Sequence, residues 1–208
     1  MFSLVTLAFI ISTSIVEAVI HPIQNMYMPI ITPFAALIYL PHGVRIITAW
    51  LYGAWSIPYI FFGTLIADLL IRGTANPETI LITALVCYAS FELFKWMGLD
   101  MYKMKNVKST HLWRSLMMVT LLSSVLSSIL HNMVLQSQIL PENALQTMLA
   151  YMVGDVFGTL VLFLITMFMS KSIGLTKVKI RNWRLSYFVQ TWALCAWFFQ
   201  QTFVLQVA

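Results

Sequence analysis

Charged residues are scarce in this sequence. Lysine, arginine, aspartate and glutamate make up 9% of its 208 residues, whereas soluble domains carry about 25%. Hydrophobic residues make up 60%, and the mean hydropathy is +0.85. So few charges cannot cover the surface of a water-exposed globule of 23.8 kDa. The composition therefore excludes a secreted domain, a soluble enzyme and a disordered chain, and it predicts an integral membrane protein.

Cysteine and the common catalytic motifs are also rare or missing. Cys87 and Cys195 lie in apolar stretches, which favours buried thiols over a disulfide framework. The sequence contains no HExxH, GxSxG, CxxC or P-loop motif, so we expect no enzyme and no cofactor. No stretch is long and polar enough for a nucleic-acid-binding domain, and the formal net charge of +5 instead indicates membrane orientation.

Long intervals without charge mark the predicted membrane spans. A spanning helix needs about 20 mostly apolar residues, and apolar residues run unbroken on every face rather than alternating as in a β-barrel. We therefore predict one transmembrane domain over residues 1–208, an all-α bundle of about seven helices, with six to eight as the range. The predicted helices lie near residues 2–20, 25–40, 46–71, 78–99, 114–136, 143–170 and 185–206.

Helix-breaking residues interrupt the second predicted helix and follow it. Pro29 and Pro33 should kink the helix near 25–40, or break it into a partly re-entrant segment. Pro41 and Gly43 then predict a tight turn before the third helix.

The third predicted helix, near 46–71, is long and has breakers of its own. It contains Gly53 and Pro58, so it could form two pieces that meet at residues 56 and 57. Gly63, further along the same helix, is a candidate for close helix packing.

Ten of the twelve basic residues fall into two blocks, at 95–114 and 171–184. Two predicted spans separate the blocks, so both face the same side, which the positive-inside rule makes the cytoplasm. The N-terminus is then inside and, with seven spans, the C-terminus is outside. The blocks should contact lipid headgroups, and they could also bind a cytoplasmic or membrane partner protein. The sequence leaves a homo-oligomer open.

Asp155 is the most isolated charge in the sequence, with no other charged residue for twelve positions before it or fifteen after it. An ionisable group at the centre of a span costs at least ~2.5–3.5 kcal/mol on insertion scales. Asp155 could bind a cation, a proton or a ligand, or it could be a structural carboxylate bonded to a neighbouring helix. Gly154 and Gly158 form a GxxxG pattern that favours close approach of another helix.

Two further pairs of polar residues lie at predicted helix ends. Glu17 and His21 are one helical turn apart, and so are Asp68 and Arg72, which could form an ion pair. Both pairs should lie near the outer face of the membrane. Each could be structural or could contribute to a binding site.

The fifth predicted helix carries a polar stripe of Thr120, Ser124, Ser127 and His131. The stripe could line a cavity or could serve small-residue helix packing, and His131 could titrate near neutral pH or could be a hydrogen-bonded core residue. The charge-based orientation places six polar residues in the middle-to-outer half of the bundle. They form a candidate ligand-binding cavity and are Glu17, His21, Asp68, Arg72, His131 and Asp155.

Two segments resemble MASE-type membrane-associated sensor domains. Residues 39–70 are similar to the second-to-third-helix region of that family, and residues 151–165 are similar to its Gly-Asp-x-x-Gly helix. The matching positions are Pro41, Gly43, Pro58 and Gly63 in the first segment and Gly154, Asp155 and Gly158 in the second. The resemblance implies a sensory module of about eight helices in a bacterial cytoplasmic (inner) membrane, usually fused to a kinase or a cyclic-dinucleotide enzyme.

Three functions remain open at this point. The first is a sensory or ligand-binding membrane module that acts through a partner protein, because the sequence shows no output domain of its own. The second is a small transporter or the substrate-binding subunit of one, resembling in size the membrane components of energy-coupling-factor importers. The third is a membrane enzyme or haem protein with His21 and His131 as ligands, since His42 and His111 are expected near the opposite, cytoplasmic face.

Overall fold

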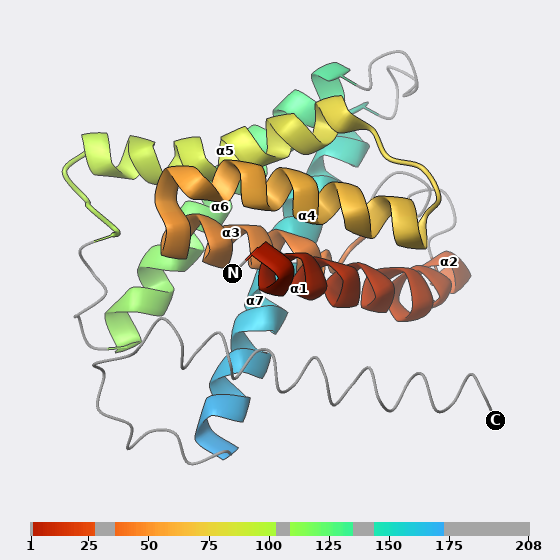
Figure 1. The fold of residues 1–208 in the computed structure, drawn as a ribbon, viewed down its shortest axis with the longest axis horizontal. Helices are drawn as coiled ribbons and strands as arrows, with labels where there is room; N and C mark the ends of the chain where they lie inside the picture. The colour runs from red at the N-terminus through yellow and green to blue at the C-terminus, as the bar shows by residue number, and fades with distance from the viewer. Residues whose placement is uncertain (1, 28–35, 103–108, 135–143, 173–208) are drawn as a thin grey trace.

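The computed structural model describes residues 2–27, 36–102, 109–134 and 144–172 (Figure 1). These residues are 89% helical and contain no strand, which confirms the predicted all-α class. Five helical stretches within them are long and apolar enough to cross a membrane. By length and composition they are Phe2–Tyr27, Leu40–Ile71, Pro77–Trp96, Trp113–Val134 and Leu145–Phe168, and the second of them reverses direction at Gly53–Trp55 (Figure 1). The predicted helix near 185–206 and most of the basic block 171–184 lie outside the described residues.

The first helical stretch is longer than the predicted 2–20. It consists of α1 (Phe2–Ile15), the π-helical turn η1 (Val16–Ile20) and α2 (His21–Tyr27). The π-helical turn lies just before Pro22, which has no N–H group to continue the α-helical hydrogen-bond pattern. The helix therefore passes through this proline instead of ending before it.

The prediction of a helix near 25–40 is wrong for the end of that range. Residues 36–39 are not helical, and Pro29 and Pro33 lie outside the described residues. The backbone N–H of Tyr39 donates to the carbonyl oxygen of Gly154 at 2.9 Å. This non-helical segment 36–39 therefore lies directly against α7 (Ala144–Ser172).

The predicted turn at Pro41 and Gly43 is also wrong, because both residues belong to α3 (Leu40–Tyr52). Pro41 is in the first turn of the helix, where a backbone N–H would have no partner within the helix, so proline costs no hydrogen bond there. Gly43 faces α7, where an added Cβ would lie 3.1 Å from the Cα of Thr159. This glycine permits a close helix contact rather than a reversal of the chain.

The chain reverses instead at η2 (Gly53–Trp55), between α3 and α4 (Ser56–Ile71), as Figure 1 shows. Gly53 has φ of 58°, a left-handed conformation that other residues adopt only with strain. The expectation that Gly53 and Pro58 divide the 46–71 helix is confirmed. Along α4, Gly63 packs against the ring of Phe9 in α1.

Three longer helices complete the described bundle: α5 (Pro77–Trp96), α6 (Ser109–Val134) and α7. Helix α7 crosses the others steeply and packs on α3 and α6 (Figure 1). Fully buried Phe9, Ile46, Ile60 and Phe91 form the apolar core between α1, α3, α4 and α5. The polar cavity described next lies at the end of α4 where the chain turns into α5.

Candidate functional site

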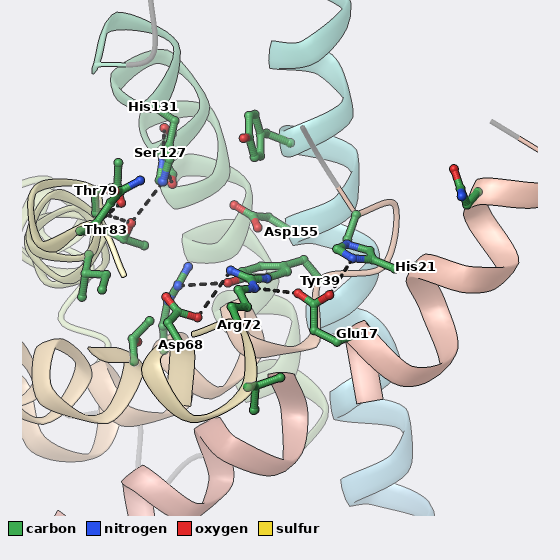
Figure 2. Close-up of a pocket in the computed structure, with 18 of the residues that line it drawn as sticks. Glu17, His21, Tyr39, Asp68, Arg72, Thr79, Thr83, Ser127, His131 and Asp155 are labelled. Carbon is green, nitrogen blue, oxygen red and sulfur yellow. Dashed lines mark hydrogen bonds and ion pairs between the residues drawn. The ribbon is translucent and has the colours of Figure 1, made fainter. Parts of the chain in front are cut away.

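A cavity of about 1050 Å³ is lined by η1, by α2 to α7 and by the non-helical residues 36–39 (Figure 2). The six residues that the sequence predicts to converge all line it, although they come from five different helical elements. They are Glu17, His21, Asp68, Arg72, His131 and Asp155. The predicted convergence is therefore observed, while a ligand-binding role for these residues remains a prediction.

The charged residues that line the cavity all lie outside the two basic blocks. Arg45 and Arg72 are the two basic residues outside those blocks, and both line the cavity. Three of the seven acidic residues of the chain, Glu17, Asp68 and Asp155, line it as well. An apolar chain with few charges thus places five of them around one cavity.

Arg72 connects the two predicted polar pairs into one chain of contacts. Its Nε donates to Glu17 Oε1 at 2.6 Å, and its Nη1 lies 3.4 Å from Asp68 Oδ1. Glu17 Oε2 lies 3.0 Å from His21 Nδ1. Figure 2 shows the Arg72 side chain between the two carboxylates. The predicted Asp68–Arg72 ion pair is confirmed, and the Arg72–Glu17 contact additionally joins α4 to η1.

The protonation state of Arg72 follows from these neighbours. Burial lowers its pKa, but Tyr39 and the carboxylates of Asp68 and Glu17 outweigh that effect and raise the pKa above its ordinary value. Arg72 therefore stays charged and neutralises part of the acidic lining.

His131 lies on the opposite wall, on α6. Its Nδ1 lies 2.9 Å from the carbonyl oxygen of Ser127, and its Nε2 lies 3.5 Å from Thr83 Oγ1 on α5. Its ring packs beside Tyr151 of α7 with a centroid distance of 5.5 Å. His131 therefore joins α5, α6 and α7 at the cavity.

The polar stripe of α6 divides into two parts. Ser127 and His131 line the cavity, whereas Thr120 and Ser124 are fully buried away from it. Thr120 and Ser124 donate to carbonyl oxygens of their own helix. The cavity interpretation of the stripe therefore holds for Ser127 and His131.

Asp155 lies on α7, where the two glycines flank it. The GxxxG pattern accommodates the non-helical segment 36–39 rather than the predicted second helix, because a Cβ at Gly154 or Gly158 would overlap the backbone of Ala36 or Tyr39. The Asp155 side chain is 7% exposed, and its Oδ2 lies 3.2 Å from Nδ1 of His42. The expectation that His42 lies near the face opposite the site is therefore wrong.

His42 contacts Asp155 from the first turn of α3, and Tyr39 and Arg45 line the same cavity. Sequence reasoning missed these roles of His42, Arg45 and Tyr39. The reason is the incorrect turn, which removed His42 and Arg45 from a helix. Their spacing of three residues places both on one face of α3, so a helix beginning at Pro41 would have brought them together.

Arg45 is buried, and its guanidinium has an incomplete set of partners. Its Nη2 donates to the hydroxyl of Tyr39 at 3.3 Å, and its Cζ lies 5.2 Å from the centre of that ring. Its Nε has no hydrogen-bond partner within the described ranges. Arg45 therefore faces the interior of the bundle.

Comparison with known proteins gives no family for this chain. No family model, no curated protein and no solved structure matches it. Among the described residues, no group of three or more histidine, cysteine, aspartate or glutamate side chains is arranged to hold a metal ion. The cavity and its charges are therefore the basis for a functional assignment.

Proposed function

We propose that this chain is an integral membrane protein whose helical bundle binds a small polar ligand in the cavity and acts through a partner protein. The observation that carries the proposal is the concentration of charge around the cavity. Five charged side chains from α3, α4, α7 and η1 line it, in a chain with 9% charged residues. A cavity of this volume is of the size that small-molecule sites have in proteins.

The energetic cost of those charges supports the same conclusion. An ionisable residue at the centre of a membrane span costs at least ~2.5–3.5 kcal/mol on insertion scales. The contacts of Arg72 offset part of this cost for Glu17 and Asp68. Within the described ranges, Asp155 contacts His42 and forms no ion pair with Arg45. A polar ligand between Arg45 and Asp155 would supply the missing contacts.

The positions of the basic residues support an external site in a bacterial cytoplasmic membrane. Lys95 and Arg114 belong to the first basic block and lie at the end of α5 and near the start of α6. The cavity lies at the other ends of these helices, beside Thr79 and His131. The positive-inside rule then favours a cytoplasmic basic block and an external cavity.

A sensory mechanism would be a population shift. A ligand that binds one packing of α3 and α7 more tightly than another would shift the equilibrium toward that packing. The shift cannot exceed the difference between its affinities for the two packings. The basic blocks 95–114 and 171–184 would transmit the change to a cytoplasmic or membrane partner, or to a second copy of the chain. The resemblance of residues 39–70 and 151–165 to MASE-type domains supports this form of the proposal.

One observation favours transport as a second candidate. Residues 36–39 are non-helical, pack on α7, and contribute Ala36 and Tyr39 to the cavity lining. Discontinuous segments of this kind line substrate sites in many transporters, because non-helical backbone at membrane depth is tolerated only where protein or a cavity covers it.

Native mass spectrometry of the purified protein, released from membranes in nanodiscs, tests the proposal. We expect a co-purified or added small polar metabolite to remain bound to the wild type and to the matched control Glu78→Gln. Glu78 is an exposed acid in the first turn of α5, outside the cavity lining. Asp155→Asn should reach the membrane normally and retain at least about tenfold less ligand.

If a broad metabolite mixture leaves no bound species on the wild type, or if Asp155→Asn and Glu78→Gln retain it equally, the proposed site is wrong. Uptake of the identified molecule into proteoliposomes would indicate the transporter. Binding without uptake would indicate the sensory module.

A further inference from the structure

We infer that the ligand is a small zwitterion, of amino-acid size, whose ammonium group contacts Asp155 and whose carboxylate contacts Arg45. This inference rests on the proposed function and adds the chemical class of the ligand. It follows from two buried, opposite charges that face one cavity without pairing with each other.

Arg45 provides the anion-binding half. The residue is 6% exposed, lines the cavity, and keeps its Nε without a hydrogen-bond partner among the described residues. Tyr39 holds the guanidinium through its hydroxyl and its ring, which fixes the direction of the remaining donors. A guanidinium with a free donor matches a carboxylate, because the planar fork can donate two parallel hydrogen bonds to it.

Asp155 provides the cation-binding half. Its carboxylate accepts no hydrogen bond from the described residues, and His42 is its one ionisable neighbour at ion-pair distance among them. The ring nitrogens of His42 make no hydrogen bond within the same ranges. The carboxylate therefore retains acceptor capacity that an ammonium group, with three donors, would use.

The other charges of the cavity are already engaged. Arg72 contacts both Glu17 and Asp68, and His21 contacts Glu17. Arg45 and Asp155 are therefore the cationic and the anionic group of the cavity that can still bind a charged partner. A ligand with a single charge would satisfy one of them and leave the other buried and uncompensated, which is costly.

The decisive comparison uses ligands that differ by one charged group. The wild-type protein in nanodiscs would be titrated by calorimetry with the standard α-amino acids. The tightest binder would then be compared with its amine, which lacks the carboxylate, and with its carboxylic acid, which lacks the ammonium. We expect the zwitterion to bind at least about tenfold more tightly than either analogue, because each analogue leaves one buried charged group without a partner.

Variants assign each end of the ligand to its residue. In Asp155→Asn, the zwitterion should lose its advantage over the carboxylic acid, while the acid binds as it does to the wild type. In Arg45→Gln, the zwitterion should lose its advantage over the amine. Glu78→Gln and Arg114→Gln are matched controls, because both residues are exposed and lie outside the cavity lining. If both cavity variants fail to fold, the three wild-type titrations still decide the question.

Equal binding of the zwitterion and either analogue to the wild type would overturn the inference, and so would the absence of binding by every amino acid. If the protein instead binds another class of metabolite, and Asp155→Asn weakens that binding, the zwitterion inference is wrong but the proposed function still holds. A protein that binds no small molecule at all would overturn both.

Discussion

The Nδ1 atom of His42 lies 3.2 Å from Oδ2 of Asp155, in the buried contact between α3 and α7. His42 is completely buried, and Asp155 is 5% exposed. The contact brings the first turn of α3 against the middle of α7. It also couples the helix of Arg45 to the helix of Asp155, so a ligand between these residues would act on the α3–α7 contact.

The His42–Asp155 contact should appear as a coupling energy. We expect the change in unfolding free energy of the double variant His42→Gln/Asp155→Asn to differ from the sum of the two single changes by about 0.5–3 kcal/mol. The reason is that the two side chains are buried and in contact. Reversible unfolding in detergent would measure the three free energies. Additivity within about 0.3 kcal/mol would show that the two side chains do not interact.

Alanine at Gly154 or Gly158 should destabilise the protein by about 1–3 kcal/mol, the usual cost of overpacking. The added Cβ would overlap the backbone of segment 36–39, which cannot rotate aside as a side chain can. The control is Val153→Ala on the exposed face of the same helix. Thermal unfolding measures the effect, and equal melting temperatures for Gly158→Ala and Val153→Ala would contradict the observed packing.

Removing Arg72 should cost more than removing Glu17. Arg72→Gln leaves the carboxylates of Glu17 and Asp68 without their shared cation, whereas Glu17→Gln leaves the Asp68–Arg72 pair intact. Both Arg72 and Glu17 are about a third exposed, so each variant should lower the unfolding free energy by about 1 kcal/mol or less. Chemical unfolding of both variants beside Arg114→Gln would measure this. The reverse order would mean that the chain of contacts does not stabilise the fold.

The contribution of Arg72 should not depend on pH in the neutral and alkaline range. Its pKa is raised in the folded protein, so its stabilising effect is complete below the ordinary arginine pKa and is lost only above it. The stability difference between the wild type and Arg72→Gln should therefore stay constant from about pH 7 to about pH 10. A difference that disappears within this window would indicate that another group carries the effect.

Gly53→Ala should destabilise the reversal between α3 and α4. Its φ of 58° would cost an L-residue about 1–2 kcal/mol. Ala54→Ser, in the same turn on an exposed residue, is the control and should change stability little. Unfolding of both variants provides the measurement. A neutral Gly53→Ala would mean that the turn adopts another backbone conformation.

Hydropathy and helical spacing predict most of the helices and the polar cluster. The apolar runs near 78–99, 114–136 and 143–170 appear as α5, α6 and α7, because long uncharged stretches have few alternatives to a helix. Glu17 and Asp68 line one cavity as expected, although Glu17 lies within the helical stretch Phe2–Tyr27 and not at its end. Such periodic features are local and can be recognised from the sequence.

The segment around residues 36–45 could not be predicted in the same way. Pro41 and Gly43 suit either a turn or the first turn of a helix, and only the packing of α3 on α7 selects the helix. The partner of the GxxxG pattern is likewise a tertiary property, because the glycines at 154 and 158 specify a close approach but not what approaches. The error at Pro41 removed His42 and Arg45 from the predicted site.

The central claim is that the cavity beside Asp155 is a water-accessible site within a membrane-embedded bundle. Cysteine labelling tests it most directly, in a background with Cys87 and Cys195 replaced by alanine. Thr79 lines the cavity and is half-buried, whereas Ser90 is fully buried and lies off the lining. A membrane-impermeant thiol reagent added to whole cells should modify Thr79→Cys and leave Ser90→Cys unmodified. Equal protection or equal modification of the two cysteines, from either side of the membrane, would contradict the account.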